Sequence, residues 1–417
     1  MQSTSYRRRG VILPGTRGLP SRRWRRILLA GVIFLLLLGA AFHWRATIAV
    51  RGSDVSRQVI GTNNTLRLEA LYFRADDAMT RLRYRLFGGG GGTPVSLAVQ
   101  GHVAANGATV PRSLRIGPVA PAVPVAPVPD APPAAVPPVY AHTPSQGEGV
   151  WQPITLAGAL RAPFSALHPI STTYLRPDPA RPYATVTLAE VSAASVSLHL
   201  VAGTSEPGTA LGVSGTGAIP ARVLDGGALI AAFNGGFRYQ DGHYGMIVDG
   251  TTVSTMKDGL ATIATYRDGS FRIGIWGADI VPSPDLVSAR QNAIPLVDHG
   301  VISPQIDAGG TTWGFVWYTS KNFYTTRSAI GLTPDGRLVF AEGYQVNART
   351  FATALQQAGL RVAMQLDINT PYTQLALYEA AANSIHGFNL TSWMGQDPQN
   401  FFSGRARDFG YVTIRGK

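Results

Sequence analysis

The sequence predicts an α+β protein, in which a mixed β-sheet carries packed helices. From residue 149 onward, strand-like runs alternate with Gly, Asp and Pro turn residues. Asp-Gly dipeptides typical of hairpin turns stand between such runs at 249–250, 268–269 and 335–336. Helical patterns stand out in this part of the chain at 285–292 and 350–358. The expected strands span 184–190, 195–202, 228–234, 245–248, 261–266, 271–276, 328–333, 337–341, 362–367 and 411–415.

The positive charge of the chain is concentrated at its N-terminus. The formal net charge is +12 over 417 residues, and eight arginines before residue 27 supply two thirds of it without an intervening acid. A charge held in a short tail is not the basic face that a nucleic-acid binder needs, so that class is disfavoured. We expect residues 1–26 to form a basic cytoplasmic tail that interacts with anionic lipid.

The tail is followed by an uncharged apolar run from Ile27 to Phe42, flanked by Trp24 and Trp44. This pattern predicts a single transmembrane helix over 27–44, with a cleaved signal peptide as the alternative. The arginines before the run place the N-terminus in the cytoplasm and the C-terminal domain outside it, at the cell membrane. Because the chain has no cysteine, disulfides, thiolate zinc sites and cysteine nucleophiles are excluded.

Two connecting segments are expected before the folded domain. Apolar positions recur with a mostly helical period between 65 and 87, which predicts a juxtamembrane helical stalk over 45–87. A self-association element and a surface amphipathic segment are the alternatives. Five consecutive glycines and a proline-rich stretch make 88–148 a Gly/Pro-rich linker. The domain itself is expected over 149–417, with its core at 225–415.

Polar residues at the ends of apolar strands are the candidate site residues. Asn234 ends one strand and is followed by Gly235 and Gly236, which let the backbone approach a ligand closely. An ordinary strand-to-turn exit is the alternative. Arg327 and Ser328 begin another strand, where a guanidinium can grip a phosphate through two parallel hydrogen bonds. A surface arginine in a salt bridge explains the same residues.

A third strand ends in Asp367, with Asn369 and Pro371 directly after it. A carboxylate after an apolar strand is either a desolvated acid suited to proton transfer or a residue that caps a turn. No cofactor is expected. The histidines are scattered and no metal motif is present, although the segment 307–310 offers oxygen ligands for a divalent cation.

Taken in order, four motifs resemble the phosphodiester glycosidase family, which includes N-acetylglucosamine-1-phosphodiester α-N-acetylglucosaminidase and membrane-anchored bacterial members. They are AAFNGGF at 231–237, YGMIVDG at 244–250, TRSAIGLTPDGRLVF at 326–340 and AMQLDIN at 363–369. The resemblance covers residues 225–415. It implies a hydrolase that cleaves a sugar-1-phosphodiester.

The resemblance also implies roles for individual residues. Asn234, Gly235 and Gly236 would line the sugar pocket, and Arg327 with Ser328 would hold the phosphodiester. Asp367 would be the leading acid or base, beside Asn369. Glycosidic cleavage usually takes a second carboxyl group, for which Asp249, Asp307 and Glu342 are the candidates.

The chain departs from the family pattern after the last strand. Many members have Asp-Gly-Gly-Gly-Ser there, whereas this chain has Asp-Ile-Asn-Thr-Pro at 367–371. We therefore expect a membrane-anchored extracytoplasmic glycosidase acting on envelope glycans, with phosphorylated sugar or envelope glycan as its partner. The alternative is a catalytically silent glycan-binding or scaffold protein on the same fold.

Overall fold

A computed structural model of the chain describes residues 55–88, 133–138, 145–154, 156, 170–208, 212–310, 312–314, 316–319, 322–381 and 384–415. The predicted basic tail and the predicted span at 27–44 lie outside these ranges, as does most of the predicted linker. Within the described residues, no helix combines the length and the apolar composition that crossing a membrane requires.

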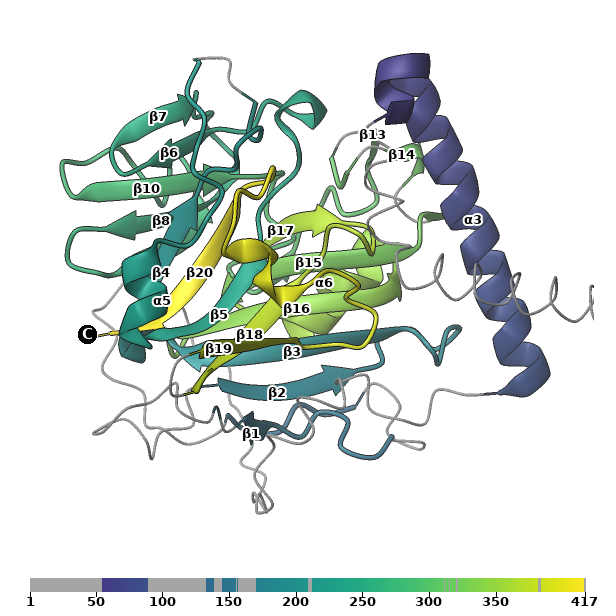
Figure 1. The fold of residues 1–417 in the computed structure, drawn as a ribbon. Coiled ribbons are helices and arrows are strands. Elements are labelled where there is room, and N and C mark those ends of the chain that lie inside the picture. The colour runs from purple at the N-terminus through teal and green to yellow at the C-terminus, as the bar shows by residue number, and fades with distance from the viewer. Residues whose placement is uncertain are drawn as a thin grey trace, which may run out of the picture. The chain divides into compact units, whose positions relative to one another are not determined.

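The fold is mostly β, so the prediction of an α+β class is wrong (Figure 1). Three antiparallel sheets and a two-stranded ribbon account for the strands. The largest sheet has the order β1 (Gln152–Ile154), β2 (Ile170–Leu175), β3 (Thr185–Ser192), β16 (Arg337–Val346), β15 (Thr325–Leu332), β17 (Val362–Ile368), β11 (Val297–Asp298) and β12 (Val301–Ile302).

Two five-stranded sheets and the ribbon complete the strand set. One sheet has the order β19 (Ser384–Asn389), β18 (Leu375–Ala381), β5 (Leu229–Asn234), β20 (Phe409–Ile414) and β4 (Val196–Val201). The other has the order β7 (Thr251–Ser254), β6 (Met246–Val248), β10 (Leu286–Gln291), β8 (Ala261–Tyr266) and β9 (Phe271–Ile275). The ribbon pairs β13 (Gly309–Gly310) with β14 (Val316–Thr319).

One error in the sequence analysis contributes to the wrong class. Residues 285–292 were expected to be helical, but Leu286–Gln291 form β10, which pairs antiparallel with β6 and β8. Pairing on both edges gives the segment hydrogen bonds and burial in the sheet. Their stabilising effect outweighs the weak local preference of this short segment for a helix. The sheets are also not mixed, since every paired strand runs antiparallel to its neighbour.

The described helices are α3 (Thr62–Phe87), α5 (Ala221–Gly226) and α6 (Ala348–Gln357), with 3-10 turns η2 (Ala193–Ser195), η3 (Tyr239–Asp241) and η5 (Pro398–Phe401), and residues 55–60 are also helical. The helix predicted at 350–358 is confirmed. Asn347 begins α6 in a capping box with Thr350, and Gly359 follows its end with a φ of 81°.

The main core lies between the sheets. Ile330 and Met364 of the largest sheet, Ile230 and Val412 of the β5 sheet, and Ile263 of the β10 sheet all belong to one buried cluster. Helix α6 buries the opposite face of the largest sheet. This packing holds the ends of β5, β15 and β17 next to one another, and the candidate site residues lie at these ends.

Candidate functional site

The end of β5 is joined to β15 and β17 through one amide side chain. The Nδ2 of Asn234 donates to the Oγ of Ser328 at 3.0 Å, and that hydroxyl donates to the carbonyl of Asp367 at 2.8 Å. The Oδ1 of Asn234 accepts from the backbone N–H of Gln374 at 2.9 Å. Three motifs that are far apart in the sequence therefore meet, and Asn234 serves as the connection between them.

The two glycines after Asn234 lie in close packing. A Cβ on Gly235 would lie 2.0 Å from the Oδ2 of Asp408, so only glycine fits at this position. A Cβ on Gly236 would lie 3.2 Å from the Nη2 of Arg290, a tight contact that a small shift of the neighbour relieves. The carbonyl of Gly235 accepts from the N–H of Asp367 at 3.0 Å, which aligns the two strand ends.

A buried ion pair stands behind these glycines. Arg290 donates from Nε to Asp408 at 2.8 Å, and both residues are at most 2% exposed. The Nη2 of Arg290 also donates to the carbonyl of Phe237 at 2.8 Å. Because its donors are directed at fixed acceptors, Arg290 supports the loop after β5.

Asp367 presents a nearly buried carboxylate at the end of β17. Asp367 is 8% exposed, and its Oδ1 accepts a hydrogen bond from the N–H of Ile368 at 2.9 Å. Its Oδ2 accepts from the Nη2 of Arg407. Burial raises the pKa of Asp367 to about 6, although the positive charge of Arg407 opposes the rise. Such a group exchanges protons near neutral pH.

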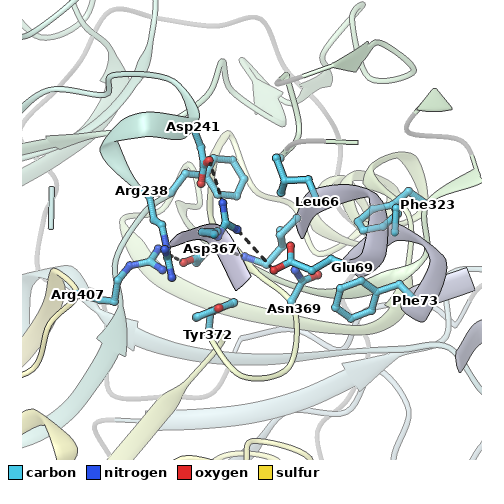
Figure 2. A pocket seen from close by; sticks show the side chains of 15 residues that line it. Leu66, Glu69, Phe73, Arg238, Asp241, Phe323, Asp367, Asn369, Tyr372 and Arg407 are labelled. Atoms are coloured by element: carbon cyan, nitrogen blue, oxygen red, sulfur yellow. Dashed lines mark hydrogen bonds and ion pairs between the residues drawn. The ribbon is translucent and has the colours of Figure 1, made fainter. Parts of the chain in front are cut away.

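Asp367 lines a cleft with an empty volume of about 550 Å³, open solvent included (Figure 2). The cleft contains a second carboxylate, Asp241, at the end of η3. Burial raises the pKa of Asp241, and the nearby arginines Arg57, Arg407 and Arg238 partly reverse that rise. Two partly desolvated carboxylates thus share one cleft.

Cationic and aromatic groups surround the carboxylates. Arg238 and Arg407 both line the cleft, and their guanidinium carbons lie 6.0 and 5.2 Å from the ring centre of Tyr372. The cleft therefore holds three guanidinium groups, those of Arg57, Arg238 and Arg407, beside an equal number of carboxylates. It also offers an aromatic face, and guanidinium groups next to an aromatic ring are suited to an anionic sugar derivative.

Helix α3 forms one wall of this cleft through Leu66, Glu69, Ala70 and Phe73. The ring of Phe73 meets that of Phe323 edge to face, with centres 5.8 Å apart. Just before the helix, the Nη1 of Arg57 lies 3.9 Å from the Oδ1 of Asp241. A segment remote in sequence thus contributes to the electrostatics of the site.

Asn369 also lines the cleft and has a φ of 74°. Its side-chain oxygen accepts from the hydroxyl of Thr325 at 2.8 Å. Asparagine tolerates this left-handed conformation better than most residues do. The chain therefore makes its turn after β17 without the glycines of the family pattern, and it places an amide at the cleft.

Arg327 lies elsewhere than the phosphate-binding hypothesis requires. It is 0% exposed, does not line the cleft, and donates from Nη1 to the carbonyl of Trp313 at 2.9 Å. Its Nε and Nη2 have no hydrogen-bond partner, and burial lowers its pKa to about 9. Phe323, whose ring centre is 5.8 Å from the guanidinium, connects Arg327 to the cleft.

The candidates for the second carboxylate lie outside the cleft. Asp249 is exposed in the turn between β6 and β7. Glu342 is fully buried and accepts from Thr373, Thr391 and Trp393 at 2.8, 2.5 and 3.0 Å. Burial raises the pKa of Glu342 to about 8. The geometry favours Asp241 over both.

The third candidate, Asp307, forms an exposed ion pair with Arg349 at 2.6 Å. It is also the acid of the segment considered for a divalent cation. No cluster of three or more His, Asp or Glu residues that could hold a metal ion occurs in the described ranges.

Sequence reasoning missed the cleft residues Arg238, Asp241, Tyr372 and Arg407. Arg238 and Asp241 follow the NGGF motif directly, and Arg407 comes just before β20. Taken alone, each resembles a polar residue in a surface loop. Their closeness in sequence to the recognisable ends of strands was the one feature that could have marked them as site residues.

The fold and cleft define an antiparallel β domain with two partly desolvated carboxylates beside arginines. Residues 227–367 match the sequence model of the phosphodiester glycosidase family. The predicted resemblance is thereby confirmed for these residues. No curated protein sequence matches the chain.

Solved structures with low similarity include the catalytic domain of zebrafish N-acetylglucosamine-1-phosphodiester alpha-N-acetylglucosaminidase, auto-inhibited by its pro-peptide. It is 17% identical, with a TM-score of 0.38, and the match covers 63% of this chain and 87% of that one. A Synechocystis protein is 13% identical, with a TM-score of 0.36 and coverages of 60% and 63%. A protein from Burkholderia pseudomallei, described as exported, is 11% identical, with a TM-score of 0.29 and coverages of 55% and 74%.

Proposed function

We propose that this chain is an extracytoplasmic glycosidase, held at the membrane, that hydrolyses a sugar-1-phosphodiester in envelope glycans. The observation that carries the proposal is the presence of Asp241 and Asp367 in one cleft that Arg238 and Arg407 also line. Paired carboxylates are the usual equipment of enzymes that cleave glycosidic bonds. The family match over 227–367 supports the same class of reaction.

The reaction breaks the bond between the anomeric carbon and the bridging phosphate oxygen. Water supplies the new hydroxyl at that carbon, and the phosphate monoester departs with the bonding electrons. We assign Asp367 the role of the base that activates water or of the nucleophile that attacks the anomeric carbon, because Arg407 favours its ionised form. We assign Asp241 to the opposing role, as the acid or the stabilising charge.

The arginines serve the leaving group. A phosphate monoester is a weak base and needs little protonation, so the developing negative charge has to be stabilised instead. Arg238 and Arg407 line the cleft and are placed to do this electrostatically. Tyr372, against which both guanidinium groups lie, offers an apolar face for the sugar ring.

The location rests on the N-terminal sequence. Eight arginines precede the uncharged run from Ile27 to Phe42, and few basic residues follow it closely. That asymmetry supports a cytoplasmic N-terminus and an extracytoplasmic domain. Protease treatment of intact cells and of lysed cells tests this, because an extracytoplasmic domain is cleaved in both.

Activity is tested with the purified full chain on methyl phosphodiesters of sugar-1-phosphates, in both anomers and with several sugars. We expect release of free sugar, and at least a 100-fold loss in Asp367→Asn. Asp335→Asn, an exposed acid in the β15–β16 turn, is the matched control. The proposal fails if no substrate is cleaved, or if Asp367→Asn retains the activity of the parent.

A silent glycan-binding protein is the second candidate, favoured by the replacement of the family's glycine loop at 367–371. The same panel separates the two functions. Binding of uncleaved glycan by both the parent and Asp367→Asn, without any release of sugar, would establish the binding protein.

A further inference from the structure

Helix α3 has two faces of different character. Leu66 and Ala70 are buried against the domain at 8% and 5% exposure. In a helix with 3.6 residues per turn, Leu68 points about 200° around the helix axis from Leu66. Leu68 and the apolar residues aligned with it therefore lie on the side that faces away from the domain. One face of α3 is thus already occupied by the wall of the cleft, and the other is open.

The open face carries an apolar stripe. Its members recur at intervals of three and four residues within 68–72 and within 79–86, and these two groups are seven residues, about two turns, apart on the same side of the helix. They are 50–65% exposed, far above the burial expected of such large apolar side chains. We call this set the α3 stripe: Leu68, Leu71, Tyr72, Met79, Leu82 and Leu86.

The charged residues of α3 are divided between the two faces, except for Arg81, which lies 3.0 Å from Asp77 and 5.9 Å from the ring centre of Tyr324 on the domain side. Its five arginines, at 67, 74, 81, 83 and 85, are all exposed. Its acids are turned toward the domain side. Asp76 accepts from Gln345 at 2.8 Å, Asp77 accepts from Arg181 at 3.0 Å, and Glu69 lies 3.5 Å from Arg57.

The arginines lie beside the stripe. Positions 67, 74 and 85 are seven and eleven residues apart, close to two and three helical turns, and therefore form a row along one edge of it. An apolar stripe edged by arginines is the arrangement of a helix that lies in a membrane interface, where the long side chains reach the headgroups.

We propose that the α3 stripe lies on an anionic phospholipid surface, with the arginine row bound to the headgroups. Charge complementarity selects this occupant, because a second copy of α3 would offer the arginine row no matching acids: Asp76, Asp77 and Glu69 are paired on the domain side. The helix would then separate the bilayer from the cleft. Since an α-helix with its side chains is about 10–12 Å across, the cleft would lie that close to the membrane.

The absence of cysteine allows a single label to report the depth of the helix. Met79→Cys in the full chain is labelled with an environment-sensitive fluorophore. The labelled protein is reconstituted in phosphatidylcholine vesicles that contain about 30% phosphatidylglycerol as the anionic lipid. Val301→Cys on β12 is the matched control, since Val301 and Met79 are 63% and 64% exposed. Contributions of residues 1–54 to vesicle attachment are common to both variants.

We expect a blue shift at position 79 and quenching by brominated lipid acyl chains, with neither at position 301. Replacing the arginines at 67, 74 and 85 with glutamine should weaken the quenching at least tenfold. Pure phosphatidylcholine vesicles should weaken it likewise. Leu86→Cys, 65% exposed on the same stripe, gives a second labelled site.

Three results would overturn the proposal. Absence of a shift at both stripe sites shows that the stripe does not meet lipid. A shift equal at 79 and 301 shows non-specific adsorption. A shift that occurs without lipid and rises with protein concentration shows that the stripe packs against a second copy of this chain.

Discussion

The Oδ2 of Asp367 accepts a hydrogen bond from the Nη2 of Arg407, and these two residues join the end of β17 to the segment before β20. The side chains are only 11% and 16% exposed. Arg407 also donates to the carbonyl of Gly236 at 3.2 Å. One guanidinium therefore contacts both the carboxylate and the loop after β5, and it tunes the charge of the cleft.

Replacement of Arg407 with alanine should shift the acid limb of the pH–rate profile upward. Burial already raises the pKa of Asp367 to about 6, and Arg407 lowers it. Without the guanidinium the pKa rises further, so the ionised form appears only at higher pH. We expect the acid limb of the kcat/KM profile to move upward by about one pH unit. Arg272→Ala, an exposed arginine on β9, is the control, and an unmoved acid limb contradicts the role of Arg407.

Asp241→Asn should move the same limb in the opposite direction. The charge of Asp241 raises the pKa of Asp367, so its removal lowers that pKa. At the same time we expect kcat/KM to fall about 100-fold through loss of the second carboxyl group. Both changes are measured in one pH series. A full rate with an unshifted profile would show that Asp241 lies outside the catalytic pair.

Gly235→Ala should destabilise the fold by about 1–3 kcal/mol, because its Cβ would lie 2.0 Å from the carboxylate of Asp408. Urea unfolding measures the free energy. Gly208→Ala is the matched control, since its Cβ would meet Tyr239 at 3.4 Å, an ordinary contact. Equal stabilities of the two variants would contradict the proposed close packing after β5.

The two fully buried arginines should respond differently to methionine. Arg290→Met leaves Asp408 buried without its partner and should cost about 3–5 kcal/mol. Arg327 has two unpartnered nitrogens, so Arg327→Met should leave the unfolding free energy unchanged or raise it by about 1 kcal/mol. Urea unfolding of both variants checks the contrast, which fails if the two lose equal stability.

The Arg327→Met variant also tests the phosphate-binding hypothesis. A buried cation without a counter-charge is retained at a cost in stability, and such costs often serve function. Because Arg327 is 0% exposed and does not line the cleft, we expect an unchanged KM for the phosphodiester substrate. A higher KM would restore the phosphate-binding hypothesis.

Glu342→Gln should remove a pH dependence of stability. The pKa of Glu342 is raised to about 8, above the value near 4.5 of an unfolded chain. Between these values the native state binds more protons, so stability falls as pH rises from about 4.5 to about 8. The variant should therefore unfold less readily than the parent at pH about 8, by roughly 1–3 kcal/mol. Parallel pH curves of the two proteins would refute this.

Local sequence patterns located ten of the twenty described strands and the turns between them. Strand-like runs between turn residues predicted β8 at 261–266 with the bounds that the structure has, and all three Asp-Gly turns connect successive strands. The motifs around Asn234, Ser328 and Asp367 were also found in advance, because polar residues at strand ends are visible without any tertiary contact. The strand at 286–291 was missed because its pairing with β6 and β8 is non-local.

By itself, the sequence determined the positions of half of the described strands, the family resemblance and the acid at the end of β17. Only the tertiary structure decided that Asp241 and Arg407 join that acid and that Arg327 is sealed in the core. It also decided that α3 forms one wall of the cleft. The physical reason is that alternation and turn preferences act between neighbours in the chain, whereas burial and charge pairing depend on segments that folding brings together.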